Sequence, residues 1–226
     1  MIAYISQNAD NRIIESLRRE GFEVHLLAPF DALTAPTNTH ADMLLLSVGD
    51  TVFVHKDYPV ELSDVKNVVK IDEPIGSKYP SDVRLNIAIV GKNAICNTKY
   101  ASRTILNHLK NQGYEIAHVP QGYAHCSTCI VSTNALITAD ESIFEAAKML
   151  GIDALKIVSG HISLPPYDYG FIGGASGTDE NKVYFCGSLS HHPDGEKIRE
   201  FIKKHGKDVC ELTPLPLEDI GGMLLI

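Results

Sequence analysis

Acidic residues recur along this chain at similar intervals, each just ahead of a short apolar run. In chain order the positions are Asp42, Asp82, the His125-Cys126 pair, Asp168 and Asp219. The intervals are 40 residues, 44 to the cysteine, 42 and 51. Carboxylates held in a confined space stay ionised only beside a cation. Such a set therefore predicts a shared site whose occupant is a planar guanidinium or a divalent metal.

Each of these acids also has a simpler explanation. An aspartate before a strand often accepts a backbone hydrogen bond in an Asx turn and needs no ligand. That explanation is the better one for any single position. Four carboxylates at one repeat position favour the shared site, with the side chains around one central channel.

The elements that would position these residues repeat as well. Four segments have apolar residues at helical spacing and end at a glycine, which lacks the Cβ that penalises left-handed backbone. These helices are Asp10–Glu20, Lys99–Gln112, Glu141–Leu150 and Pro193–His205, followed by Gly21, Gly113, Gly151 and Gly206. A short strand follows each glycine. A fifth copy has its strand at Lys66–Asp72, but Asp57–Val65 is too short for a full helix.

Two further strands precede each helix. The expected pairs are Met43–Ser47 with Thr51–His55, Val83–Val90 with Ala94–Asn97, Ile130–Ser132 with Ala135–Ala139, Phe171–Ile172 with Lys182–Cys186, and Met223–Ile226 with Ile2–Ser6. The last pair joins the two ends of the chain, which removes exposed sheet edges. We predict one α/β domain, residues 1–226, in which five ββαβ modules form a propeller closed by this pairing. An open doubly wound sheet is the alternative, but its β-α-β alternation does not match the observed rhythm.

The amino-acid composition and net charge limit the kinds of molecule that the protein is expected to bind. The 226 residues are 44% hydrophobic and 21% charged, which are ordinary values for a globular domain. A net charge of −8 without a basic run argues against nucleic acid. The apolar runs are too short to span a bilayer, the N-terminal residues show no signal-peptide pattern, and five cysteines do not suggest a disulfide framework. We expect a cytoplasmic protein that binds a small molecule rather than a membrane; its oligomeric state stays open.

Three segments resemble the pentein superfamily of guanidino-group-modifying enzymes, and within it the dimethylarginine hydrolase branch. Ser81–Gly91 is similar to the family's Gly-Gly-Asp strand, His125–Ile137 to the strand pair with the catalytic histidine, and Glu218–Ile226 to the closing Asp-Gly-Gly segment. The whole chain also resembles an uncharacterised bacterial group of this superfamily. The resemblance implies attack of a cysteine thiolate on a guanidinium carbon. It gives Asp82 and Asp42 as substrate-side acids, and His125 falls one position from the expected histidine.

One feature departs from that family. Its cysteine nucleophile follows the closing glycines, whereas Gly221–Ile226 contain no cysteine. Guanidine hydrolysis of the usual kind needs that thiolate. We therefore expect a protein that binds a small cationic or polar metabolite, guanidinium compounds included, without turnover and without a cofactor. The alternative is a C–N hydrolase with a rearranged site that uses Cys126 and His125, although nearby carboxylates would raise the thiol pKa and weaken it.

Two other motifs are weaker. Cys126 and Cys129 form a Cys-x-x-Cys, but strand alternation would put them on opposite faces and only half the usual zinc ligands are present, so we expect no metal. Gly173 and Gly174 lie in a glycine-rich segment that could bring backbone N–H groups to a ligand. A tight turn between strands explains these glycines equally well.

Overall fold

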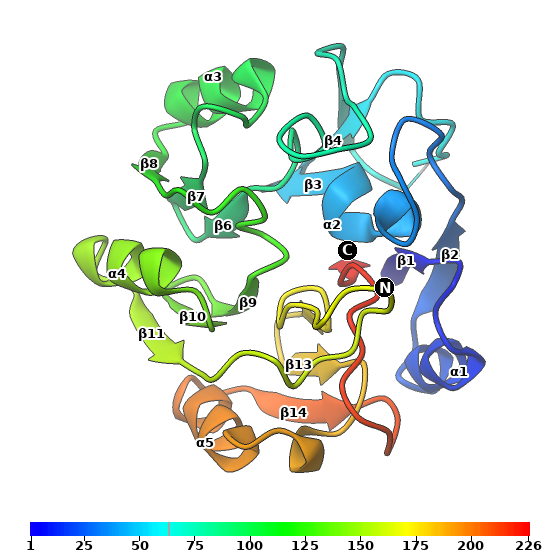
Figure 1. Cartoon of the computed structure of the whole chain (residues 1–226), viewed down its shortest axis with the longest axis vertical. Coiled ribbons are helices and arrows are strands. Elements are labelled where there is room, and N and C mark those ends of the chain that lie inside the picture. Colours follow the sequence, from blue (N-terminus) through cyan, green and yellow to red (C-terminus); the bar gives the residue numbers. More distant parts are fainter. Residues whose placement is uncertain (63) are drawn as a thin grey trace.

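Five three-stranded sheets surround the middle of the molecule in the computed structural model, which describes residues 1–62 and 64–226 (Figure 1). The sheets are β15-β1-β2, β3-β4-β5, β6-β7-β8, β9-β10-β11 and β12-β13-β14, and we number the units one to five in this order. In every unit the middle strand is antiparallel to the first and parallel to the third. This is the predicted strand-strand-helix-strand repeat.

The strands are short. Those of units one and two are β15 (Leu224–Leu225), β1 (Ile2–Ser6), β2 (Glu23–Leu27), β3 (Leu45–Val48), β4 (Thr51–His55) and β5 (Asn67–Ile71). Unit three has β6 (Ala88–Val90), β7 (Asn93–Cys96) and β8 (Glu115–His118). Units four and five have β9 (Thr128–Ser132), β10 (Ala135–Thr138), β11 (Asp153–Lys156), β12 (Ser176–Thr178), β13 (Lys182–Phe185) and β14 (Asp208–Glu211).

Four units carry a helix between their second and third strands. These helices are α1 (Asn11–Arg19), α3 (Arg103–Asn111), α4 (Glu141–Met149) and α5 (Gly195–Lys204); the single turns α2 (Ala41–Leu44), η1 (Thr37–Thr39) and η2 (Leu189–His191) complete the set. Asp10, Ser102 and Asp140 cap three of the helices by accepting a backbone N–H of the first turn. The glycine after each helix has φ between 71° and 91°, as predicted. Residue 63 of Asp57–Val65 lies outside the described residues, and the rest of that segment holds no helix.

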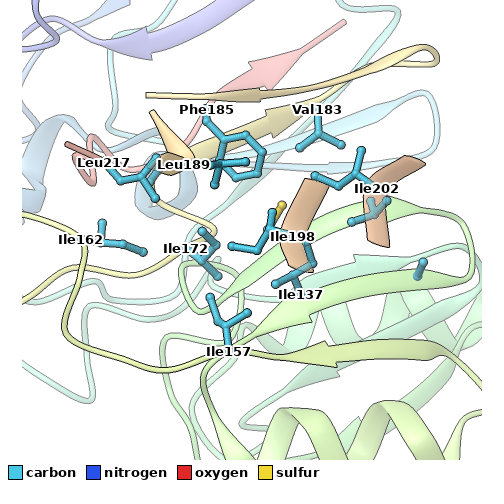
Figure 2. Packing of buried hydrophobic residues seen from close by; sticks show 14 residues of the cluster. Ile137, Ile157, Ile162, Ile172, Val183, Phe185, Leu189, Ile198, Ile202 and Leu217 are labelled. Atoms are coloured by element: carbon cyan, nitrogen blue, oxygen red, sulfur yellow. The ribbon is translucent and has the colours of Figure 1, made fainter. Parts of the chain in front are cut away.

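Buried side chains fill the spaces between neighbouring units. Figure 2 shows the cluster between units four and five, where Ile137 and Ile157 meet Phe185, Ile198 and Ile202. Each side chain of this size stabilises the fold by about 1.5–3 kcal/mol when it is fully buried. The packing fixes each unit against the next and thereby positions the inner first strands. Among the described residues, no helix is long and apolar enough to cross a bilayer.

The predicted pairing of the two chain ends is present. In β1 and β15, Ala3 lies opposite Leu225 and Tyr4 opposite Leu224. Beyond them, the backbone N–H of Ile2 donates to the carbonyl of Ile226 at 2.6 Å, and the reverse bond is 2.9 Å. Figure 1 places both ends together near the middle of the molecule.

Several first strands begin later than predicted. Met43 and Leu44 belong to α2, the described chain before β6 turns instead of extending, and Phe171–Ile172 is a turn ahead of β12. The cause is local backbone bonding: the N–H of Asn86 donates to the carbonyl of Val83 at 3.2 Å, and the N–H of Ala175 to that of Phe171 at 3.1 Å. These turns carry the polar side chains of the candidate site.

Candidate functional site

Asp42 lies in α2, the single turn that leads into β3. Its backbone N–H donates to the carbonyl of Gly221 at 2.9 Å, which ties α2 to the segment before β15. The residue is 3% exposed and lines a pocket of about 510 Å³ formed largely by the first strands of the sheets. Neither carboxylate oxygen has a hydrogen-bond partner among the described residues. Burial, and then the carboxylate of Asp219, raise the pKa of Asp42 to about 7.

Asp219 is a second buried carboxylate, held by backbone donors. Its Oδ2 accepts the N–H of Phe171 at 2.8 Å, and its Oδ1 accepts the N–H of Gly221 at 2.9 Å. The second bond is an Asx turn, the simpler explanation given above for each acid. Burial nevertheless raises the pKa of Asp219 to about 6. The Nδ1 of His40 is 3.7 Å from Oδ1, and burial lowers the pKa of His40 to about 4, so this ring is neutral at pH 7.

Cys126 lies in the turn before β9, near both carboxylates. Burial raises the pKa of its thiol well above the ordinary value, and Asp42 and Asp219 raise it further. The side chain of Asn86 fixes this turn: its Nδ2 donates to the sulfur at 2.9 Å, and its Oδ1 accepts the N–H of His125 at 2.7 Å. The thiol is therefore protonated at neutral pH. Among the described residues, no group of three His, Cys, Asp or Glu could hold a metal ion.

His125 lines the same pocket as Asp42 and is half-buried. Its Nδ1 has no hydrogen-bond partner in the described part of the chain. Burial lowers the pKa of the ring to about 4, so the imidazole is neutral at pH 7 and offers one donor and one acceptor. Asp42 and His125 thus give the pocket one acidic and one neutral side chain with free hydrogen-bonding capacity. Asp179, Glu180 and Lys207 line it as well.

Asp82 and Asp168 do not join this cluster. Asp82 is buried, but its Oδ2 accepts the hydroxyl of Tyr123 at 2.7 Å, and the residue does not line the pocket of Asp42. Tyr123 in turn contacts the rings of Tyr79 and Phe171. Asp168 is exposed to solvent and lines no part of the pocket. The prediction that four carboxylates point toward one cavity is therefore wrong for both: Asp82 is buried against Tyr123, and Asp168 is exposed.

The glycines Gly173 and Gly174 are explained by packing. A Cβ on Gly173 would overlap the carbonyl oxygens of His125 and Cys126, and a Cβ on Gly174 would overlap the carboxylate of Asp219. The N–H of Gly174 donates to the carbonyl of Cys126 at 3.0 Å and is not free for a ligand. Gly173 does line the pocket. The glycine-rich turn therefore brings the chain close to the carboxylate of Asp219 and to the carbonyls of His125 and Cys126.

A different set of residues occupies the equivalent place in the five units. Two positions before each first strand stand Met43, Asn86, Cys126, Gly174 and Gly222. Neighbours in this set touch: the Nδ2 of Asn86 is 3.3 Å from the sulfur of Met43, and the N–H of Gly222 donates to the carbonyl of Gly174 at 2.7 Å. Sequence reasoning missed Asn86. The available signal was its place just before the apolar run Ile87–Val90.

The chain matches one family model and several solved structures. Residues 4–224 match the model of a family described as a family of unknown function (DUF6873). No curated protein matches the chain. Solved structures do, among them a dimethylarginine dimethylaminohydrolase adduct with 4-chloro-2-hydroxymethylpyridine. That structure is 13% identical, with 94% of this chain and 92% of that chain covered and a TM-score of 0.58.

Two further similar structures belong to the same superfamily. A variant of the dimethylarginine enzyme from Pseudomonas aeruginosa complexed with citrulline is 14% identical over 94% of this chain and 91% of that chain, with a TM-score of 0.56. An agmatine deiminase from C. jejuni is 9% identical over 94% and 87%, with a TM-score of 0.54. The chain therefore has the fold of the pentein superfamily, which confirms the resemblance at the level of the fold.

Proposed function

For a chain that belongs to the family of unknown function DUF6873, we propose a binding role: a small cationic metabolite occupies the pocket beside Asp42 and is not turned over. The observation that carries this proposal is the Asp42 carboxylate, which is buried at the wall of the pocket. Among the described residues no N–H or O–H group donates to either of its oxygens, and only the Cys126 thiol lowers its pKa from a neighbouring side chain. A buried carboxylate without partners stays ionised only at a large free-energy cost. A bound cation offsets that cost and supplies the missing donors.

The chemistry of the pocket supports a cation with an apolar body. Asp42 and His125 are among its polar residues, while Leu45, Ile87 and Ile130 are among the apolar residues that form its walls. Lys207 also lines the pocket, and its ammonium group donates to the backbone carbonyls of Asp179 and Glu180. A guanidinium offers five N–H donors in one plane and suits a carboxylate with two free oxygens. Relatives of this fold were solved with citrulline or a substrate bound, which is consistent with a nitrogen-rich ligand.

The proposal also covers how the five units are arranged around the pocket and in which compartment the protein works. We infer that the five units form one closed propeller domain, residues 1–226, with the pocket along its axis. The pairing of β15 with β1 supports this inference because it joins unit one to itself across the chain ends. The five free cysteines fit a reducing compartment such as the cytoplasm.

Binding is tested by titrating the protein with agmatine, arginine and methylguanidine in a calorimeter. We expect weak binding, with a Kd on the order of 0.1–1 mM, because a single buried carboxylate pairs with the cation. Asp42→Asn should weaken it by about tenfold or more, since the neutral amide loses the ion pair. Asp168→Asn is the matched control, because Asp168 is exposed and outside the pocket. Equal affinity of the Asp42→Asn variant and the wild type would refute the proposed site.

Turnover is a separate prediction. Arginine, agmatine and methylated arginines should give no citrulline or urea above background, because the Cys126 thiol stays protonated when burial and two carboxylates raise its pKa. The alternative hydrolase with Cys126 as nucleophile makes the opposite prediction. Turnover that vanishes in Cys126→Ala but survives in Cys129→Ala would establish that alternative and overturn the non-catalytic role.

A further inference from the structure

A second pocket, of about 210 Å³, lies between the start of α4 and the segment that leads from β11 to β12. Its walls are mainly apolar and include Ala139, Ile157, Ile162, Phe171 and Ile172. Three of them, Ile157, Ile162 and Ile172, belong to the core cluster in Figure 2, so the pocket has a rigid back wall. It is distinct from the pocket of Asp42, which none of these five residues lines.

The rim of this pocket combines polar residues, such as Glu141 and Ser159, with two apolar side chains. Val158 and Tyr169 both line it and are 48% and 43% exposed. Both are among the large apolar side chains of the described chain that stay exposed, and both border the same opening. An apolar molecule bound at this opening would contact the side chains of Val158 and Tyr169 and would shield their apolar surface, and its own, from water.

Ser127 is the polar group of this pocket without a partner. The residue is 3% exposed and lines the pocket, and its Oγ has no hydrogen-bond partner among the described residues. Its backbone is fully engaged: the N–H donates to the carbonyl of Tyr123 at 2.9 Å, and the carbonyl accepts the hydroxyl of Thr138 at 2.8 Å. A buried hydroxyl group without a hydrogen-bond partner is destabilising, so the Oγ of Ser127 can form one hydrogen bond with a polar group of a ligand.

The charged residues of the pocket argue for a neutral ligand. Asp140 caps α4 through the N–H of Ile143 at 3.0 Å and accepts the Nε2 of Gln121 at 2.9 Å. Glu141 forms an ion pair with Lys156. Both carboxylates thus already have hydrogen-bond or ion-pair partners and do not need a cationic ligand. Their negative charge disfavours the binding of an anionic ligand.

We propose that this pocket binds a neutral, mainly apolar molecule of about the size of a substituted benzene, whose single polar group hydrogen-bonds with the Oγ of Ser127. An apolar cavity of about 150 Å³ holds benzene in other proteins. The volume of about 210 Å³ leaves room for one polar substituent. This site takes no cation and does not depend on Asp42, so it stands apart from the binding role proposed above.

The test uses phenol, benzene and benzoate as probes in amide NMR titrations of the full chain. Phenol and benzene should shift the backbone signals of residues 157–162 and 170–172, whereas benzoate should not. Ser127→Ala should weaken the binding of phenol by about fivefold and leave the affinity for benzene unchanged, because only phenol loses a hydrogen bond. Ser159→Ala is the matched control. Ser159 lines the same pocket but is exposed, so its substitution should change the affinity for neither phenol nor benzene.

A second variant separates the pocket from the hydrogen bond. Ala139→Leu fills the space that the ring would occupy and should abolish the shifts caused by both phenol and benzene. Ser127→Ala should fold with an unchanged or higher Tm, since it removes an unpaired hydroxyl, and it therefore keeps the test valid if Ala139→Leu is unstable. Phenol that binds Ser127→Ala as tightly as the wild type, or that shifts none of these signals, overturns the proposal.

Discussion

Asp42→Asn is expected to raise the free energy of unfolding above about pH 7 by on the order of 3 kcal/mol. Burial and the Asp219 carboxylate raise the pKa of Asp42 from 3.8 to about 7. Between these two values the native protein keeps a proton that the unfolded chain has released. The stability of the wild type therefore falls as the pH rises from about 4 to about 7 and stays low above that range. The neutral amide of asparagine has no such dependence.

Urea unfolding at about pH 5 and about pH 8 measures this difference. In Asp42→Asn the free energy of unfolding should still fall somewhat as the pH rises, because the pKa of Asp219 is also raised, to about 6. Asp168→Asn, at an exposed position, should follow the wild type. Agmatine should stabilise the wild type at about pH 8 and not Asp42→Asn, since a ligand that binds only the native state adds to its stability. An unchanged pH slope in Asp42→Asn would show that this carboxyl titrates normally.

The repeat was the part of the fold that the sequence could predict, because it depends on local chemistry. Helices that end at Gly21, Gly113, Gly151 and Gly206 follow from apolar spacing and from the need for left-handed backbone at these glycines. The starts of the first strands were predicted too early. In the segments before β3, β6 and β12, turns and a single helical turn satisfy the backbone locally, and apolar composition alone does not distinguish them from strands.

The candidate site was predictable only in part. The carboxylate of Asp219 raises the pKa of Asp42, and both carboxylates raise the pKa of the Cys126 thiol, so the three lie close together as their repeat positions suggested. Asp168 and Asn86 show the limit of that reasoning. The alignment placed every acid at one repeat position, whereas the residues in contact are those two positions before each first strand, and Asn86 holds that place in unit three. An error of a few residues in a strand boundary thus exchanges an exposed acid for a buried contact.

Deleting residues 223–226 is expected to lower the free energy of unfolding by more than about 4 kcal/mol, or to prevent folding. The deletion removes β15, makes β1 an edge strand that is paired only with β2, and breaks the two backbone bonds between Ile2 and Ile226. It also removes Met223 and Leu225 from the cluster around α1, and Leu224 from the cluster around Tyr4. Equilibrium unfolding in urea, followed by circular dichroism, gives the value.

A double substitution separates the packing contribution from the strand pairing. Leu224→Ala with Leu225→Ala keeps the backbone bonds of β15 but removes its half-buried side chains, and should cost only about 1–3 kcal/mol. Met149→Ala is the control for loss of an apolar side chain, because Met149 is 81% exposed and should change stability by less than about 0.5 kcal/mol. A truncated chain that unfolds within about 1 kcal/mol of the wild type would show that the pairing of the chain ends contributes little to holding the five units together.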